Sequence, residues 1–299
     1  MKTKYQILNV VLLLLVSLNV SAADKLTVYS VNYPLAYFAE RIGGEHVEAV
    51  FPVPHDVDPA FWEPAAKDIA TFQQADVILL NGAGYARWLK RASLPQRKLV
   101  NTSAAFKKDY INVTETATHQ HGPGGDHSHA GTAFTTWLDF SQAIQQAKAI
   151  QLALEKRRPE YADVFRRNYA VLETELDKLD KKITELAARD PDKLFVASHS
   201  VYQYFSRRYQ LNLQSVMWEP DVVPENYQWE ELRQLLRDHP AKWMIWEGKP
   251  DERSVTRLKE IGVDSLVISP CANVPEEGDF MSVMTENVLQ LEKAYLHNK

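Results

Sequence analysis

Hydrophobic and polar positions along the chain follow two periodicities, which alternate from one segment to the next. Short runs of β-branched and aromatic residues are typical of buried strands, and apolar residues three and four positions apart are typical of helices. In the first half, strands are predicted at residues 25–30, 46–53, 76–82 and 98–103, with helices at 33–44 and 64–75. Strands that alternate with helices indicate parallel sheets built from βαβ units.

The same alternation returns in the second half, after two consecutive helices at residues 136–157 and 160–189. Strands are then predicted at 193–198, 213–218, 241–246 and 264–269, with helices at 200–210, 226–239, 254–262 and 279–299. A helix of 30 residues is about 45 Å long, enough to join two units. We therefore predict an α/β fold of two lobes, each a parallel sheet flanked by helices, joined by one long backbone helix.

The N-terminus, "MKTKYQILNVVLLLLVSLNVSAADK", places two lysines before an apolar run that ends at Val20-Ser21-Ala22. This order is typical of a cleavable signal peptide, and the apolar run is too short to cross a bilayer. The predicted organisation is a signal peptide at 1–22, an N-terminal lobe at 23–158, a linking helix at 159–189 and a C-terminal lobe at 190–299. We expect a periplasmic protein that does not span the membrane.

Charge and cysteine content exclude two classes of function. The net charge of −5 argues against a nucleic-acid partner, which demands a basic face. Cys271 is the only cysteine, so the chain can form neither an internal disulfide nor a zinc site of several cysteines. Any metal ion must be held mainly by His, Asp or Glu.

A histidine-rich stretch, "HQHGPGGDHSHAG", interrupts the alternation between the two halves. It contains His119, His121, His127 and His129, four of the nine histidines of the chain. Imidazoles are common ligands of transition metals, and the glycines leave such a loop free to fold around an ion. The alternative is a disordered tract that binds metal only weakly.

Ligands of open parallel sheets bind outside the carboxyl ends of the strands. In the second half, His199 and Glu247 follow predicted strands, and in the first half His55 lies close to one. If the two sheets face each other, these side chains converge on one cleft. The alternative for His199 is a histidine that only hydrogen-bonds the strand ends, and for Glu247 an ion pair with a neighbouring Lys or Arg.

The chain resembles the periplasmic zinc- and manganese-binding proteins of metal ABC transporters over nearly its whole mature length. The resemblance rests on the segments "VDPAFWEPAAKDIATFQQADVILLNGAGYARWL", "TTWLDF", "ASHSVYQYFSRRYQL" and "EEGDFMSVMTENVLQL". It implies two α/β lobes around one metal ion, a monomer, and an inner-membrane ABC permease as the partner. A His-rich loop often precedes the second ligand segment in this family.

The ligands that the resemblance implies are only partly present. The family's DPHxxEP stretch reads "DPAFWEP" here, so Ala60 replaces the first histidine, and DPHxWLD reads "AFTTWLD", so Thr135 replaces the second. The third and fourth ligand positions match His199 and Asp279, although Asp279 is also placed to cap the last helix. This chain is thus a variant that lacks two of the usual histidines.

Other histidines lie beside both gaps. His55 precedes Ala60 by five residues, and His129 precedes Thr135 by six. Because a loop of six residues spans about 20 Å when extended, His127 and His129 can reach the cleft. We predict a metal site of His199, Asp279, His129, His127 and His55, with Glu247 behind it and His119 and His121 collecting ions. The alternative is a cleft that no longer binds metal.

The predicted function is that of a periplasmic solute-binding protein that captures Zn²⁺ and delivers it to an ABC permease. Mn²⁺ or another divalent transition metal is the alternative ion, since affinity order alone does not fix the physiological one. We expect no enzyme, because no HExxH or GxSxG motif occurs; a hydrolase with Glu63 or Glu247 as base is the alternative. A third candidate is a binder of a metal chelate or other small ligand, because Ala60 and Thr135 leave space beside Phe61 and Trp62.

Overall fold

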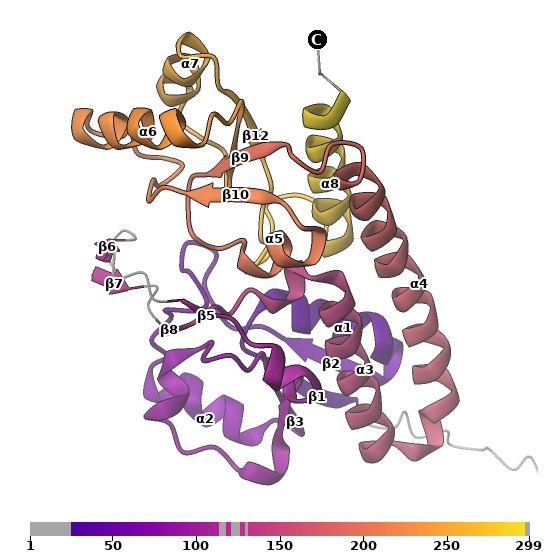
Figure 1. The fold of residues 1–299 in the computed structure, drawn as a ribbon. Coiled ribbons are helices and arrows are strands. Elements are labelled where there is room, and N and C mark those ends of the chain that lie inside the picture. Colours follow the sequence, from indigo (N-terminus) through magenta and orange to yellow (C-terminus); the bar gives the residue numbers. More distant parts are fainter. Residues whose placement is uncertain (1–24, 114–117, 121–125, 129–130, 297–299) are drawn as a thin grey trace, which may run out of the picture.

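The structure, a computed structural model, describes residues 25–113, 118–120, 126–128 and 131–296 (Figure 1). The predicted signal peptide at 1–22 lies outside these residues. The strands are β1 (Leu26–Ser30), β2 (Val47–Val50), β3 (Val77–Leu80), β4 (Leu99–Asn101), β5 (Asn112–Val113), β6 (Thr118–Gln120), β7 (Asp126–Ser128), β8 (Gly131–Thr132), β9 (Leu194–Ala197), β10 (Asn212–Ser215), β11 (Trp243–Trp246) and β12 (Asp264–Val267). The α-helices are α1 (Tyr33–Gly43), α2 (Ala66–Gln74), α3 (Phe140–Arg157), α4 (Ala162–Ala187), α5 (Gln203–Tyr209), α6 (Asn226–Asp238), α7 (Glu252–Glu260) and α8 (Phe280–Leu296).

Two four-stranded parallel sheets form the centres of the two lobes. The first has the order β2-β1-β3-β4 and the second the order β10-β9-β11-β12, so the two sheets share one topology. In the first sheet Leu26 pairs with Val47, and in the second Trp243 pairs with Phe195. The predicted two-lobed α/β architecture is confirmed, with all eight predicted strands within two parallel sheets.

The long helix α4 joins the lobes and was predicted within a few residues of its observed ends. Its 26 residues make it about 39 Å long, and it runs along one side of both lobes (Figure 1). It contacts α1 and α3 of the first lobe and α5 and α8 of the second. Its buried apolar residues recur every three or four positions and form one stripe: Phe165, Tyr169, Leu172, Leu176, Leu179, Ile183 and Leu186.

One continuous hydrophobic core extends through both lobes. It combines residues of the first sheet, such as Val28 and Ile78, with residues of the second, such as Phe195 and Ile245. A second, smaller cluster around Trp218, Trp229 and Trp246 lies in the second lobe. Because the lobes share apolar contacts through α4 and α8, they are not independent bodies joined by a free hinge.

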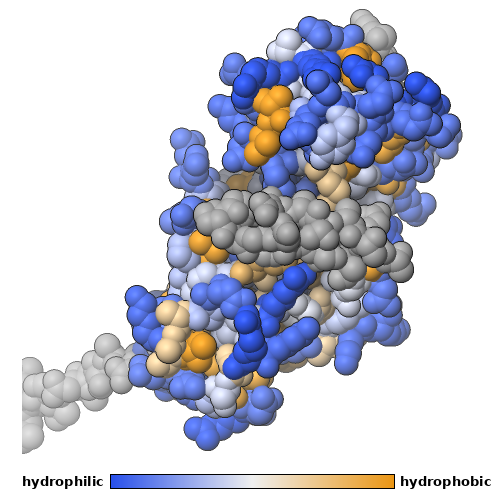
Figure 2. Space-filling view, turned by 90° about the vertical axis from the view of Figure 1, so that its left-hand side faces the viewer, coloured by the Kyte–Doolittle hydropathy of each residue, from blue (hydrophilic) through white to orange (hydrophobic). Residues whose placement is uncertain are grey.

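Hydrophilic residues predominate on the face of the molecule shown in Figure 2, and apolar residues form small separate patches there. The large apolar side chains that are exposed are scattered over several elements: Leu152, Val171, Val222, Tyr227, Leu289 and Leu296. Isolated apolar residues of this kind are normal on protein surfaces. Within the described ranges, none of the helices is long and apolar enough to cross a membrane.

A buried carboxylate ties the linking helix to the second lobe. Asp180 on α4 accepts hydrogen bonds from Arg208 Nε at 3.0 Å and from the Tyr209 hydroxyl at 2.9 Å, both on α5. Its side chain is 10% exposed, whereas that of Arg208 is 36% exposed. Asp180 therefore holds α5, which directly follows the His199 segment, in register with α4.

We predict that Asp180→Ala lowers the free energy of unfolding by about 2–3 kcal/mol, because it leaves a half-buried guanidinium and a buried phenol without their acceptor. Asp177→Ala, which breaks only the exposed pair with Lys181 on the same helix, should cost less than about 0.5 kcal/mol. Urea unfolding followed by circular dichroism measures both. Equal losses for the two variants would contradict the assignment.

Candidate metal-binding cleft

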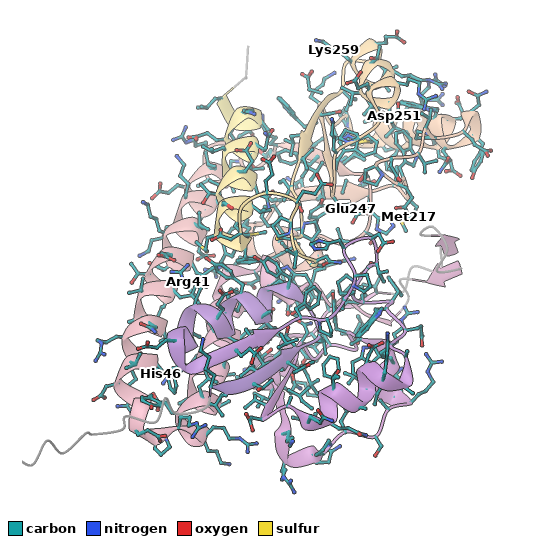
Figure 3. The ribbon with its side chains drawn as sticks, turned by 180° about the vertical axis from the view of Figure 1, so that it is seen from behind. Arg41, His46, Met217, Glu247, Asp251 and Lys259 are labelled. Atoms are coloured by element: carbon teal, nitrogen blue, oxygen red, sulfur yellow. The ribbon has the colours of Figure 1, made fainter. Side chains whose placement is uncertain are left out.

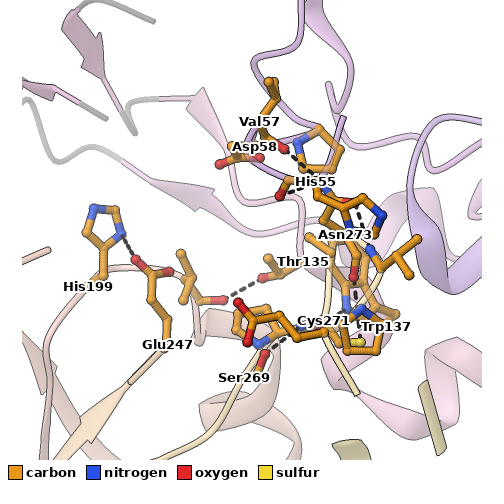
Figure 4. A pocket seen from close by; sticks show the side chains of 18 of the residues that line it. His55, Val57, Asp58, Thr135, Trp137, His199, Glu247, Ser269, Cys271 and Asn273 are labelled. Carbon is orange, nitrogen blue, oxygen red and sulfur yellow. Dashed lines mark hydrogen bonds and ion pairs between the residues drawn. The ribbon is translucent and has the colours of Figure 1, made fainter. Parts of the chain in front are cut away.

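A cavity of about 710 Å³ lies between the carboxyl edges of the two sheets. Its second-lobe wall comes from the segments that follow β9, β11 and β12, and its first-lobe wall from the loop at residues 55–59 together with Tyr85 and residues 134–137 (Figure 4). This is where parallel sheets are expected to bind ligands. Of the predicted site residues, His55, His199 and Glu247 line this one cavity.

His199 is the most buried polar residue of the cavity. It follows β9, and its segment is held by backbone hydrogen bonds from Ser198 to Ile245 and from Trp218 to Ser198. The imidazole is 1% exposed, with Nε2 3.7 Å from Glu219 Oε1 and Nδ1 4.0 Å from Glu247 Oε1 (Figure 4). A buried imidazole between two carboxylates is arranged for a cation or for its own protonated form.

Glu247 and Glu219 flank the His199 ring from neighbouring strand ends. Glu247 directly follows β11, lines the cavity and lies at the boundary between the lobes, whereas Asp251 lies farther out on the second lobe (Figure 3). Arg253, the nearest arginine that follows Glu247 in the sequence, pairs with Asp251 at 2.7 Å. Glu219 follows β10 and is not among the residues that line the cavity. The Nδ1 edge of His199, beside Glu247, is therefore the edge that faces the cleft.

Ala60 and Thr135, the positions at which the sequence resemblance implies histidines, are both buried. Ala60 is 2% exposed, and its backbone N–H donates to Asp58 Oδ1 at 2.8 Å. Thr135 is 4% exposed, and its hydroxyl donates to the backbone carbonyl of Val201 at 2.5 Å. Thr135 therefore links the first lobe directly to the segment that follows His199.

His55 approaches the cleft on a loop that the second lobe holds in place. The Asn273 amide donates to the backbone carbonyls of Pro54 at 2.7 Å and Val57 at 2.9 Å. A second interlobe bond joins the Trp137 indole N–H to the carbonyl of Pro270 at 2.7 Å. His55 itself is exposed at the cleft mouth, so its side chain has room to turn toward a bound ion.

Asp279 caps α8 and does not line the cavity. Its Oδ1 accepts from the Ser282 backbone N–H at 2.8 Å, and its Oδ2 from the Tyr37 hydroxyl at 3.3 Å. Burial raises the pKa of this carboxyl, but the hydrogen bonds from Ser282 and Tyr37 and the charge of Arg41 outweigh it and hold the pKa below its ordinary value. The capping role is confirmed, and the ligand role stays a prediction.

Cys271 stands at the cavity wall. Burial, and to a smaller extent the charge of Asp279, raises the pKa of the Cys271 thiol to about 12. The thiolate, not the thiol, is the metal ligand. The Cys271 thiol is therefore protonated at neutral pH unless a bound cation displaces its proton.

The histidine-rich stretch is described only in part. Strands β6 and β7 pair antiparallel, with His119 opposite His127, and β5 pairs with β8 at the base of the stretch. His121 and His129 lie outside the described residues. The predicted recruitment of His127 and His129 to the cleft stays a prediction.

Among the described residues, no three His, Cys, Asp or Glu side chains are grouped so that they could hold a metal ion. Of the predicted site residues, the second lobe supplies His199 and Glu247 to the cavity and the first lobe supplies the exposed His55, beside which Asp56 and Asp58 also line the wall. Sequence reasoning missed Glu219, although it too follows a strand of the second sheet. It also missed Tyr85, a buried residue of the cavity wall with no motif of its own.

The family model described as "Zinc-uptake complex component A periplasmic" (ZnuA) matches residues 28–294. The chain belongs to this family. The match covers both lobes and the linking helix, which confirms the family that the sequence resemblance indicated.

Individual relatives of this ZnuA-family chain are distant. The zinc-binding lipoprotein AdcA of Streptococcus pneumoniae is 24% identical over 283 residues, and the match covers 91% of this chain and 56% of AdcA. The high-affinity zinc uptake system protein ZnuA of Bacillus subtilis is 26% identical over 287 residues, covering 92% of this chain and 89% of that protein. The chain thus spans only about half the length of AdcA.

A solved structure has the same fold. The metal-dependent lipoprotein YcdH of Bacillus subtilis superposes with a TM-score of 0.76 at 23% identity, covering 90% of this chain and 99% of that one. At this identity the likeness establishes the arrangement of the lobes, and the cleft must be judged on its own side chains.

We predict that Thr135→Val lowers the free energy of unfolding by about 1–2 kcal/mol, since it preserves volume but leaves the buried Val201 carbonyl without its donor. Thr174→Val on the exposed face of α4 removes a comparable hydroxyl bond to Ala170 and should cost less than about 0.5 kcal/mol. Chemical denaturation of both variants measures the difference. A Thr135→Val protein as stable as the parent would show that this interlobe bond is dispensable.

Proposed function

We propose that this protein captures Zn²⁺ in the periplasm, after removal of residues 1–22 as a signal peptide, and delivers it as a monomer to an inner-membrane ABC permease. The observation that carries the proposal is the buried His199 between two carboxylates at the floor of the interlobe cleft. Membership in the zinc-uptake family over residues 28–294 supports it. The names of the relatives AdcA and ZnuA support zinc as the ion.

The cleft-facing edge of His199 offers the first two ligand atoms. Two ligand atoms of a tetrahedral zinc ion lie about 3.4 Å apart, and His199 Nδ1 and Glu247 Oε1 are 4.0 Å apart. A small rotation of Glu247 brings both within bonding distance of one ion. Glu219, at the opposite edge of the ring, is then placed to accept the Nε2 proton and orient the imidazole.

The remaining ligands are proposed from the first lobe and its histidine-rich stretch. His55 lines the cavity at its mouth, and His127 and His129 are the nearest further imidazoles in the sequence. Asp279 is reachable only if the cap and its bond to Tyr37 rearrange. We assign His119 and His121 to the collection of ions ahead of the site.

Zinc is favoured over manganese because the donors include imidazole nitrogen, which suits zinc, whereas carboxylate-rich sites suit manganese. Capture rather than catalysis is proposed, because a hydrolase needs a general base beside an open coordination position. Glu63, one candidate base, instead pairs with Arg91 on the surface. Since the lobes share one core, we propose that release of the ion depends on the permease.

His199→Ala should lower zinc affinity at least about 100-fold. Loss of a residue that only orients a metal ligand lowers affinity about 10–100-fold, and loss of a ligand itself lowers it further. Competition against a fluorescent zinc chelator at pH 7 measures it. The matched control is His46→Ala, since His46 stacks on Tyr161 outside the cleft with ring centroids 3.7 Å apart. Retention of tight binding by His199→Ala would overturn the proposed function.

The recruitment of the histidine-rich stretch needs a separate pair of variants. We expect His127→Ala with His129→Ala to lower the affinity for the most tightly bound zinc ion by about tenfold or more. His119→Ala with His121→Ala should instead reduce only the number of additional, weaker ions, as counted by isothermal titration calorimetry. If the first pair leaves the tight affinity unchanged while His199→Ala abolishes it, recruitment is wrong.

A further inference from the structure

The interlobe cavity is far larger than a metal ion requires. Its volume is about 710 Å³, whereas a water molecule occupies about 30 Å³ of liquid and pockets for small organic ligands span about 300–1,000 Å³. A bare ion on His199 and Glu247 would leave most of this space to solvent. A cavity of this volume can hold a small organic molecule.

The first-lobe wall opposite His199 is aromatic. Tyr85 packs edge-on against Phe134 and Trp137, with ring centroids 5.3 and 5.7 Å apart. All three residues are among those that line the cavity, together with Val57 and Val201. The Trp137 side chain is fully buried, with its N–H bonded to Pro270, and supports the Tyr85 ring. Such a wall suits the apolar body of an organic ligand.

One polar atom on this wall is left for a ligand. Tyr85 is 4% exposed, and its hydroxyl is buried without a hydrogen-bond partner among the residues that the structure describes. Burial, and to a smaller extent the charge of Asp58, raises the pKa of Tyr85 well above its ordinary value. The phenol therefore stays protonated and can serve as a hydrogen-bond donor. Buried donors without acceptors are rare in folded proteins.

The charges around the cavity restrict what the ligand can carry. Four carboxylates, those of Asp56, Asp58, Glu247 and Glu276, line it against one ammonium, that of Lys249, a net of three negative charges. Such a field attracts cations and repels polyanions. A chelator with several negative charges is therefore disfavoured, and a neutral or positively charged metal complex is favoured.

We propose that the cleft binds its divalent metal ion together with a small bidentate chelator of the amino-acid class, at most singly charged. The inference rests on the proposed function and names the form in which the ion is captured. When the chelator is present, it supplies two ligands in place of His55 and the histidine-rich stretch, and with His199 and Glu247 it completes the four that zinc prefers. The side chain of the chelator packs on the aromatic wall, and one of its oxygens accepts the Tyr85 hydroxyl proton in a hydrogen bond. The chelator thus takes over the role of the histidines that Ala60 and Thr135 replace.

Calorimetric titration at pH 7 tests the proposal, with Zn²⁺ alone, L-histidine alone, and Zn²⁺ with L-histidine, which chelates zinc through its amine and imidazole. In solution L-histidine competes for zinc, so it lowers the apparent affinity of any protein that binds only the bare ion. A site that binds zinc and L-histidine together has the opposite effect. We therefore expect the apparent zinc affinity to rise in the presence of L-histidine. Citrate, a polyanionic chelator, should lower it.

Tyr85→Phe should reduce the gain given by L-histidine about tenfold, the value of one hydrogen bond to a charged acceptor. Tyr295→Phe is the matched control, a tyrosine on α8 that is 7% exposed and outside the cleft, and it should leave the gain intact. The proposal is overturned if L-histidine only competes while zinc alone binds through His199, an outcome in which the proposed function stands. If neither zinc nor its histidine complex binds, both fail.

Discussion

The apolar stripe of α4 is the constraint on which the cleft depends. Residues from Phe165 to Leu186 on this helix pack against helices of both lobes and make one core of them. Two sheets of identical strand order are thereby held with their carboxyl edges toward a common space. The distance across that space is set by the helix and not by any ion, so the cleft exists before the ligand arrives. A preformed cleft saves the free energy of ordering, and its ligand must fit the space that is there.

Direct hydrogen bonds join the two lobes around the cleft. Thr135 bonds Val201, Asn273 bonds the loop of His55, and Trp137 bonds Pro270. Each pairs a side chain with a backbone carbonyl across the lobe boundary, so the contacts depend little on the state of His199. These bonds therefore hold the two lobes together independently of any ligand in the cavity.

The fold was predictable because strands of parallel sheets are buried on both faces and appear as short apolar runs. Strand β9, for example, ends in three fully buried residues, and the rule for strand ends then led directly to His199 and Glu247. Glu219 obeys the same rule, since it directly follows the predicted strand at 213–218, and it was overlooked although β10 itself ends earlier, at Ser215. Tyr85 and Asn273 lie on loops whose paths are set by tertiary contacts, which no local pattern records. The start of α8 was predicted correctly, yet the position of Asp279 behind Cys271 depends on Tyr37 and Arg41, residues more than 200 positions away.

The pair of carboxylates around His199 indicates why a divalent ion suits this site. The side chains of Glu219 and Glu247 are only 21% and 20% exposed, and the ring between them is 1% exposed. Two negative charges that share a poorly solvated region repel each other, and the repulsion is larger than it would be in water. A dication beside Glu247 compensates both charges and polarises the ring, which favours the approach of Nε2 to Glu219, 3.7 Å away. A monovalent ion would leave one charge uncompensated, and a second divalent ion on the same ring would have to displace the Nε2 proton. The second lobe thus favours one divalent ion, whatever completes its coordination from the other side.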